Sequence, residues 1–159
     1  MTRPTITRLA APPDTLDDDP PLTAVMSRDV VTIDGGARLP SALNIMATTG
    51  VRHLPVVEHG RCLGVLVETD LIRSLAPGTH PAGSAAFSAA VTTPLRRLHR
   101  PAPQLPPTAR VSDAARHMST DVSDAVLVVD GGRVLGIVTA TDLVRLLAHR
   151  ETRRTPPAP

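Results

Sequence analysis

The sequence is almost free of aromatic residues: its 159 residues include no Trp, no Tyr and a single Phe. Hydrophobic residues nevertheless make up 42% of the chain, a share that can support a folded core. That core must be built from Val, Leu, Ile, Ala and Met. The composition therefore argues against proteins that bind single-stranded nucleic acid by stacking bases on aromatic side chains.

Lysine is also absent, so all 17 basic residues are arginines, and the formal net charge is +2. A nucleic-acid-binding domain usually carries a basic patch or stripe, whereas these arginines are scattered along the chain. The pattern argues against nucleic acid as the main partner. A weaker hypothesis, contact with nucleic acid through Arg150, Arg153 and Arg154, stays open.

Cysteine is limited to Cys62, which excludes an intrachain disulfide and a cysteine-based metal site. Its apolar neighbours predict a buried small side chain. The six histidines do not stand at metal-ligand spacing from an acidic or cysteine cluster. Neither a Gly-x-Ser-x-Gly motif, nor a phosphate-binding loop, nor a plausible nucleophile–base pair is present. We therefore expect neither a metal site nor an enzyme.

Long hydrophobic runs are missing as well, and none approaches the roughly 18 residues that a membrane span requires. Residues 1–20 lack the apolar stretch of a signal peptide, which predicts a soluble, cytoplasmic protein. Residues 1–20 and 150–159 are expected to be disordered tails, because they are rich in proline and have no apolar period. Residues 77–90 are predicted to be a linker, rich in Gly and Pro at its start.

An internal repeat dominates what the sequence does contain. The stretch from Gly64 to Leu71, GVLVETDL, returns as GIVTATDL from Gly136 to Leu143. The same offset of 72 residues, without a gap, also pairs Ala42 with Ala114, Met46 with Met118, and other residues between them. The chain is therefore two copies of one unit, at residues 21–76 and 91–149.

Each copy is predicted to have the element order β-α-β-β-α. Apolar residues at helical spacing form a stripe in both copies (Leu39, Ala42, Leu43 and Met46; Val111, Ala114, Ala115 and Met118). The strands and closing helices are expected at residues 29–33, 53–57, 62–67 and 69–75, then at 125–129, 134–139 and 141–149. One copy alone would cover its sheet poorly. We expect an α+β (α/β-like) fold in which two units pack sheet to sheet about a pseudo-twofold axis, leaving two related clefts.

These features resemble a tandem pair of cystathionine-β-synthase (CBS) domains, also called a Bateman module. The resemblance rests on the two β-α-β-β-α units, on residues 25–32 and 51–57, and on the ends of the units at Gly64–Asp70 and Gly136–Asp142. It covers residues 21–149 and implies a regulatory module that senses a ligand. Such pairs commonly bind AMP, ADP, ATP or S-adenosylmethionine in the clefts. The resemblance also implies a homodimer, and a protein of unknown identity that the module regulates.

In the family motif, Gly-h-h-Thr/Ser-x-x-Asp, the Asp typically accepts hydrogen bonds from the ribose hydroxyls, and the Thr or Ser reaches ribose or phosphate. Thr139 and Asp142 complete this motif in the second copy, whereas in the first copy Asp70 follows Val67. An ionised carboxylate accepts hydrogen bonds and suits a diol, and a helix start favours anions such as phosphate. The same residues also spell a capping box, and the two roles can coexist.

Ahead of the second strand the first copy has Arg52 and His53, where the second has Asp124 and Ala125. In related modules, basic residues at this place face the phosphates of the nucleotide held by the partner unit. The resemblance therefore implies one competent site, formed by Thr139, Asp142, Arg52 and His53, and a weak site around Asp70. Two alternatives remain: the basic pair forms an ordinary polar rim, or the module is a protein-interaction scaffold that binds no ligand.

Overall fold

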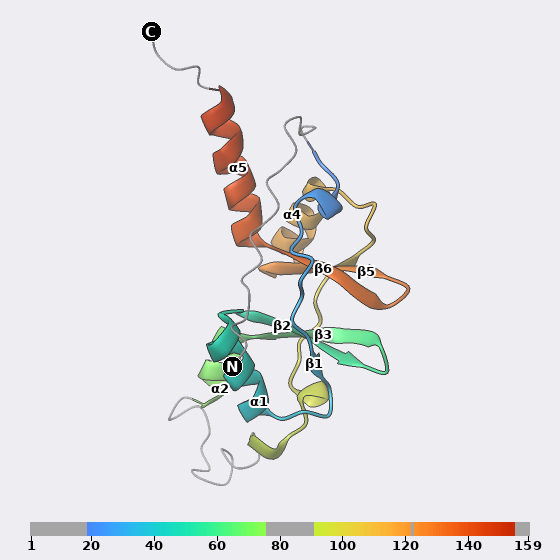
Figure 1. Ribbon diagram of the computed structural model, residues 1–159, viewed down its shortest axis with the longest axis vertical. Coiled ribbons are helices and arrows are strands. Elements are labelled where there is room, and N and C mark those ends of the chain that lie inside the picture. Colours follow the sequence, from blue (N-terminus) through green and yellow to red (C-terminus); the bar gives the residue numbers. More distant parts are fainter. Residues whose placement is uncertain (1–18, 76–90, 122, 155–159) are drawn as a thin grey trace. The chain divides into compact units, whose positions relative to one another are not determined.

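The computed structural model describes residues 19–75, 91–121 and 123–154. It divides into two compact units (Figure 1). Among the described residues, unit 1 comprises 31–75 and 91–101, and unit 2 comprises 19–30 and 102–154 except residue 122. The predicted linker at 77–90 lies outside the described residues, as do most of the first predicted tail and the end of the second.

Unit 1 contains a three-stranded sheet flanked by helices. Its elements are β1 (Ile33–Asp34), α1 (Leu39–Thr49), β2 (His53–Glu58), β3 (Arg61–Val67), α2 (Glu68–Leu75) and the short 3-10 helix η2 (Leu95–Arg97). The strand order is β1-β2-β3, with β1 parallel and β3 antiparallel to β2. The inner side of α1 is formed by Leu39, Ala42 and Met46, which are all buried, as their helical spacing predicts.

Unit 2 repeats this plan. Its elements are the 3-10 helix η1 (Leu22–Ala24), β4 (Gln104–Leu105), α4 (Val111–Thr120), β5 (Ala125–Asp130), β6 (Arg133–Thr139) and α5 (Ala140–Arg154). Its sheet has the equivalent order β4-β5-β6 and the same pairing directions. Even the irregularity of the hairpin recurs, between Val56 and Val57 in one sheet and between Val128 and Val129 in the other. The predicted β-α-β-β-α order is thus confirmed in both copies.

Three local predictions were wrong. The first strand begins at Ile33 rather than Asp29, because the chain up to Val30 belongs to unit 2 and the strand can pair with β2 only beyond it. Helix α5 continues past His149 to Arg154, since the first helix-breaking proline stands only at position 156. Ala115 is exposed, so the buried stripe of α4 is narrower than expected.

The segment that opens each repeat packs on the unit formed by the other repeat. Residues 19–30 belong to unit 2, where Ser27 exchanges backbone hydrogen bonds of 2.9 and 3.0 Å with Ile137. Residues 94–100 belong to unit 1, where Arg100 exchanges two bonds of 3.0 Å with Val65. We call residues 21–27 and 94–100 the exchanged segments. The compact units therefore do not coincide with the sequence repeats.

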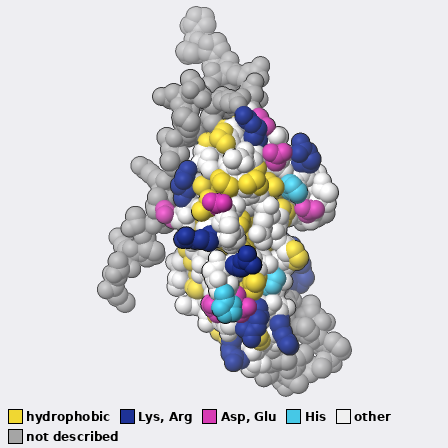
Figure 2. All heavy atoms as spheres, turned by 90° about the vertical axis from the view of Figure 1, so that its right-hand side faces the viewer, with side chains coloured by type: hydrophobic (Ala, Val, Ile, Leu, Met, Phe, Trp, Pro, Cys, Tyr) yellow, Lys and Arg dark blue, Asp and Glu magenta, His cyan; other side chains and the backbone are white. Residues whose placement is uncertain are grey.

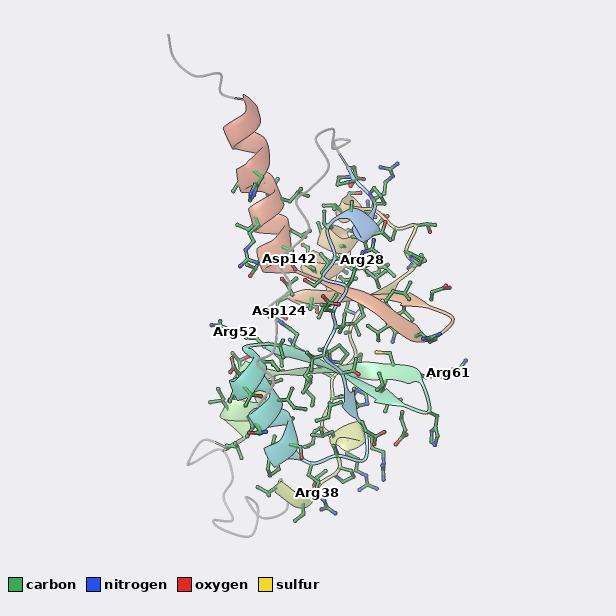
Figure 3. All side chains as sticks on the ribbon, viewed as in Figure 1. Arg28, Arg38, Arg52, Arg61, Asp124 and Asp142 are labelled. Atoms are coloured by element: carbon green, nitrogen blue, oxygen red, sulfur yellow. The ribbon has the colours of Figure 1, made fainter. Side chains whose placement is uncertain are left out.

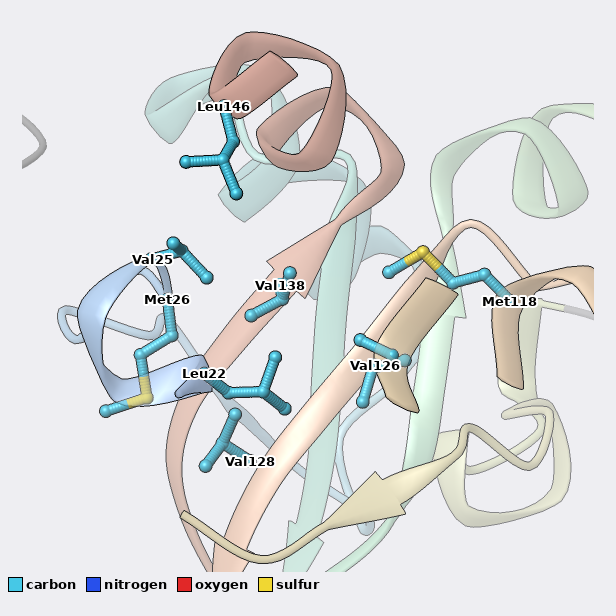
Figure 4. Close-up of a cluster of buried hydrophobic side chains, with 9 residues drawn as sticks. Leu22, Val25, Met26, Met118, Val126, Val128, Val138 and Leu146 are labelled. Carbon is cyan, nitrogen blue, oxygen red and sulfur yellow. The ribbon is translucent and has the colours of Figure 1, made fainter. Parts of the chain in front are cut away.

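Each exchanged segment contributes to a hydrophobic core. Leu22, Val25 and Met26 join Val126, Val128 and Val138 in unit 2 (Figure 4). In unit 1, Leu95 packs with Leu54, Val56 and Leu66. Leu22 and Leu95 are both completely buried, which makes the exchanged segments integral to the units that they complete.

Two strand glycines allow the exchanged segments to approach the sheets. A Cβ on Gly64 would collide with the carbonyl oxygen of Arg100, and one on Gly136 would collide with Sδ of Met26. The same residue type thus solves the same steric problem in both units. On the outside, charged side chains of both signs are interspersed (Figure 2). Among the described residues, no helix combines the length and apolarity needed to cross a membrane.

Candidate functional site

The two repeated motifs occupy junctions where a strand passes directly into a helix. In unit 1, β3 ends at Val67 and α2 begins at Glu68; in unit 2, β6 ends at Thr139 and α5 begins at Ala140. The first helical N–H donates to the carbonyl of Arg52 in one unit and of Asp124 in the other, at 2.9 Å in both. The backbones of the two junctions therefore match, and the difference between them lies in their side chains.

Thr139 and Asp142 form a capping box at the start of α5. Both the backbone N–H and Oγ1 of Thr139 donate to Oδ2 of Asp142, at 2.8 and 2.7 Å. In return the N–H of Asp142 points to Oγ1 of Thr139 at 3.4 Å. The structural role that the sequence allowed for these two residues is therefore present.

The other carboxylate oxygen of Asp142 is differently placed. Oδ1 lies 3.7 Å from Nη1 of Arg145, which is beyond hydrogen-bonding distance. The side chain of Asp142 is only 8% exposed, so the capping bonds hold an almost buried carboxylate in a fixed orientation. The result is a pre-oriented carboxylate with one oxygen engaged by Thr139 and the other available as an acceptor.

Asp70, at the equivalent place in unit 1, is held in another way. Val67 has no hydroxyl with which to cap α2, and the Asp70 side chain is 39% exposed. Its Oδ1 lies 3.3 Å from Nη1 of Arg73, and its Oδ2 lies 3.4 Å from Nη1 of Arg100. Two guanidinium groups thus flank Asp70, one at each oxygen.

Arg52 and His53 stand beside the first motif within unit 1 (Figure 3 labels Arg52 and its counterpart Asp124). The Arg52 side chain is 80% exposed, and its Nε lies 3.8 Å from Oε2 of Glu68. His53 is half-buried and pairs with Val67 across the hairpin. The structure brings Thr139 to Asp142 as expected. That Arg52 and His53 serve the same ligand as Asp142 stays a prediction, because these residues belong to different units.

Arg100 was missed by the sequence reasoning. The ungapped offset of 72 residues aligns it with Arg28, but the backbone pairs place it opposite Val65 as Ser27 is placed opposite Ile137. An offset of 73 residues, which aligns PLTAVMS at 21–27 with PLRRLHR at 94–100, was the available signal. It shows that polar or cationic residues on one exchanged segment replace small or apolar ones on the other.

Other candidate groups offer little chemistry. Within the described ranges, no three His, Cys, Asp or Glu side chains are grouped so that they could hold a metal ion. Cys62 is half-buried, and burial raises the pKa of its thiol above the ordinary value of 9.0. A neutral thiol is a poor nucleophile at neutral pH. The chemistry of the two junctions is therefore hydrogen bonding and charge, not covalent catalysis.

Comparison with known proteins gives matches over both repeats. The model of the CBS domain matches residues 22–77 and 95–149. Among solved structures, the CBS domain pair of protein MJ0100, in complex with 5′-methylthioadenosine and S-adenosyl-L-methionine, has a TM-score of 0.69 at 23% identity, covering 83% of this chain and 98% of that one. At this identity the likeness shows the fold.

Two curated relatives come from Methanocaldococcus jannaschii. The uncharacterized protein MJ1225 is 36% identical over 62 residues, 39% of this chain; its crystal structure has a TM-score of 0.66 and covers 77% of this chain and 46% of that one, at 27% identity. An L-aspartate semialdehyde sulfurtransferase is 27% identical over 129 residues, 80% of this chain. The chain spans 22% and 23% of the lengths of these two relatives.

Proposed function

This chain belongs to the CBS domain family, whose model covers both repeats, and from that membership we propose that it is a regulatory module that binds an adenosine-containing ligand. The ligand class comprises AMP, ADP, ATP and S-adenosylmethionine. Support comes from the CBS pair of protein MJ0100, which was solved with two adenosine derivatives. The module acts by differential binding: the ligand favours one arrangement of the protein, and a regulated partner responds to that arrangement.

The observation that carries the proposal is the geometry of Asp142. Thr139 engages Oδ2 with two donors, which fixes the carboxylate and leaves Oδ1 as an acceptor for a ribose hydroxyl. An acceptor that is already oriented loses little conformational entropy on binding. The capping role and the sugar-binding role therefore support each other in this proposal, in which Thr139 positions Asp142.

Arg52 and His53 complete the proposed site. Arginine is suited to bidentate contact with phosphate, and the Arg52 side chain is largely exposed, with an ion pair to Glu68 as long as 3.8 Å. We assign to it the phosphate groups of the nucleotide. Replacing Arg52 with Ala should weaken the binding of ATP more than that of S-adenosylmethionine, which carries no phosphate.

Calorimetric titration with the four ligands tests the proposal. In Asp142→Asn the amide oxygen can still accept from Thr139, while an NH2 group replaces the outer oxygen and cannot accept from a ribose hydroxyl. We expect affinity to fall about 10- to 100-fold, the equivalent of losing one hydrogen bond to a charged group. The matched variant Asp70→Asn should bind as the wild type does. Wild-type protein that takes up none of the four ligands would refute the proposal.

A second candidate function, protein interaction, is favoured by exposed apolar side chains. Ile72 on α2 and Val144 on α5 are equivalent in the two repeats and are 56% and 64% exposed; Leu147 is 62% exposed. Repeat-related apolar positions suit the self-complementary interface of a homodimer. We propose that these helices meet a second copy of the chain. Sedimentation of Val144→Glu should then show a smaller particle than the wild type, whereas equal masses would contradict the proposal.

A further inference from the structure

The two exchanged segments are equivalent in structure but not in charge. Ser27 and Arg100 occupy the same backbone place, each paired with the strand that leads to the motif. Likewise, Met26 and His99 are the neighbours that a Cβ on Gly136 or Gly64 would meet. Unit 1 therefore receives the long cationic side chain of Arg100 where unit 2 has a short, neutral serine.

Arg100 reaches the carboxylate of the first motif. Its Nη1 lies 3.4 Å from Oδ2 of Asp70, while Arg73 lies 3.3 Å from Oδ1. Arg73 has a counterpart in unit 2, because Arg145 lies 3.7 Å from Oδ1 of Asp142. At Oδ2 the two units differ, since Thr139 takes the place beside Asp142 that Arg100 takes beside Asp70. The distinctive feature of unit 1 is thus the cation at Oδ2.

We propose that Arg100 closes the first motif to sugars, so that the chain has one competent site and Asp70 serves to fasten the exchanged segment 94–100. This inference rests on the proposed function. A ribose diol at Asp70 would have to displace a charge-assisted contact, which is about twice as strong as a neutral hydrogen bond. Val67 adds to the closure because it leaves the carboxylate without the hydroxyl that orients Asp142.

The fastening role follows from the position of Arg100. Its backbone forms both hydrogen bonds to Val65, and its side chain extends along the sheet end to Asp70, in the first turn of the helix after β3. One residue therefore ties the exchanged segment to the strand and to the helix at once. Loss of the side-chain contact should loosen the backbone pair locally.

Titration calorimetry with ATP and S-adenosylmethionine tests the closure. The wild type and Val67→Thr should each bind one equivalent per chain, and Arg100→Ser/Val67→Thr, which copies the Ser27 and Thr139 of unit 2, should bind two. The matched control Arg73→Ser/Val67→Thr should remain at one. Two equivalents in Val67→Thr alone, or one equivalent in a folded Arg100→Ser/Val67→Thr variant, would overturn the role of Arg100.

Two further readouts separate this inference from the proposed function. If the wild type binds neither probe, the proposed function fails; a single equivalent gained by Arg100→Ser/Val67→Thr would still support the closure, and no gain would overturn it. Amide hydrogen exchange tests the fastening. Exchange at Val65 and Arg100 should become about three- to tenfold faster in Asp70→Asn, in line with the loss of a surface ion pair. Unchanged exchange would overturn that role.

Discussion

Thr139 donates two hydrogen bonds to a single oxygen of Asp142, at 2.7 and 2.8 Å, and the equivalent pair in the first repeat, Val67 and Asp70, makes no such contact. One difference in side chain thus separates two junctions whose backbones match. In unit 2 the carboxylate is 8% exposed and fixed by its neighbour; in unit 1 it is 39% exposed and faces two arginines. The repeats have the same fold but differ at the positions proposed to bind ligand.

Replacing the capping hydroxyl should destabilise unit 2. In Thr139→Val the carboxylate of Asp142 loses one donor, and α5 loses its N-cap side chain, which is worth about 0.5–2 kcal/mol of unfolding free energy. The reverse change, Val67→Thr, should stabilise α2. Urea unfolding followed by circular dichroism measures both, since the chain has no Trp. Equal stability of Thr139→Val and the wild type would contradict the capping role.

Much of the fold could be predicted because the relevant signals are local. The repeat of Gly64–Leu71 at Gly136–Leu143 fixed the number of units, and the spacing of Leu39, Ala42 and Met46 located a helix and its buried side. The hairpins followed from apolar runs on both sides of short polar connections. For Thr139 and Asp142 the motif predicted proximity, and the structure shows it.

The segment exchange could not be predicted, because it depends on which distant strand a segment meets. Leu22 and Leu95 have the same local pattern whichever unit they enter, and both end up completely buried. The contact between Arg100 and Asp70 depends on that exchange and was therefore also missed. Residues 91–121 and 19–75 carry the relevant sequence similarity at two different offsets, and only the ungapped one is conspicuous.

Truncating the central leucine of each exchanged segment should identify the unit that it stabilises. Leu22→Ala and Leu95→Ala each leave a cavity at a fully buried position, which costs about 2–5 kcal/mol. Hydrogen exchange should show that Leu22→Ala loosens β5 and β6, and that Leu95→Ala loosens β2 and β3. The exposed Ile72→Ala is the control and should change little. The opposite assignment of strands would contradict the exchange.

The first turn of α4 should make stability depend on acidic pH. The backbone N–H of Arg110, at 3.0 Å from Oδ2, and then the Arg116 guanidinium hold the pKa of Asp113 below its ordinary value of 3.8. A lowered pKa means that the stabilising effect is complete above about pH 4 and is lost as the pH falls through the folded-state value. Urea unfolding should therefore show Asp113→Asn less stable than the wild type at pH 6, with a smaller difference at pH 3. A difference that grows toward pH 3 would have the wrong sign.

The strand glycines offer a graded test of how closely the exchanged segments approach. At Gly64 the colliding atom is the carbonyl oxygen of Arg100, part of a backbone that is bonded to Val65 and cannot move without breaking that pair. At Gly136 the nearest atoms belong to Met26, whose flexible thioether can adopt another rotamer.

Both Gly→Ala changes overpack a core, which typically costs about 1–3 kcal/mol. We expect Gly64→Ala to reach or exceed the upper end of that range and Gly136→Ala to remain near the lower end, as measured by urea unfolding. Combining Gly136→Ala with Met26→Ala should recover part of the loss, because it removes the colliding sulfur. No truncation at Arg100 should rescue Gly64→Ala, since the obstacle there is backbone. Rescue by Arg100→Ala would therefore contradict the close backbone approach at Gly64, and with it the reason for glycine at that position.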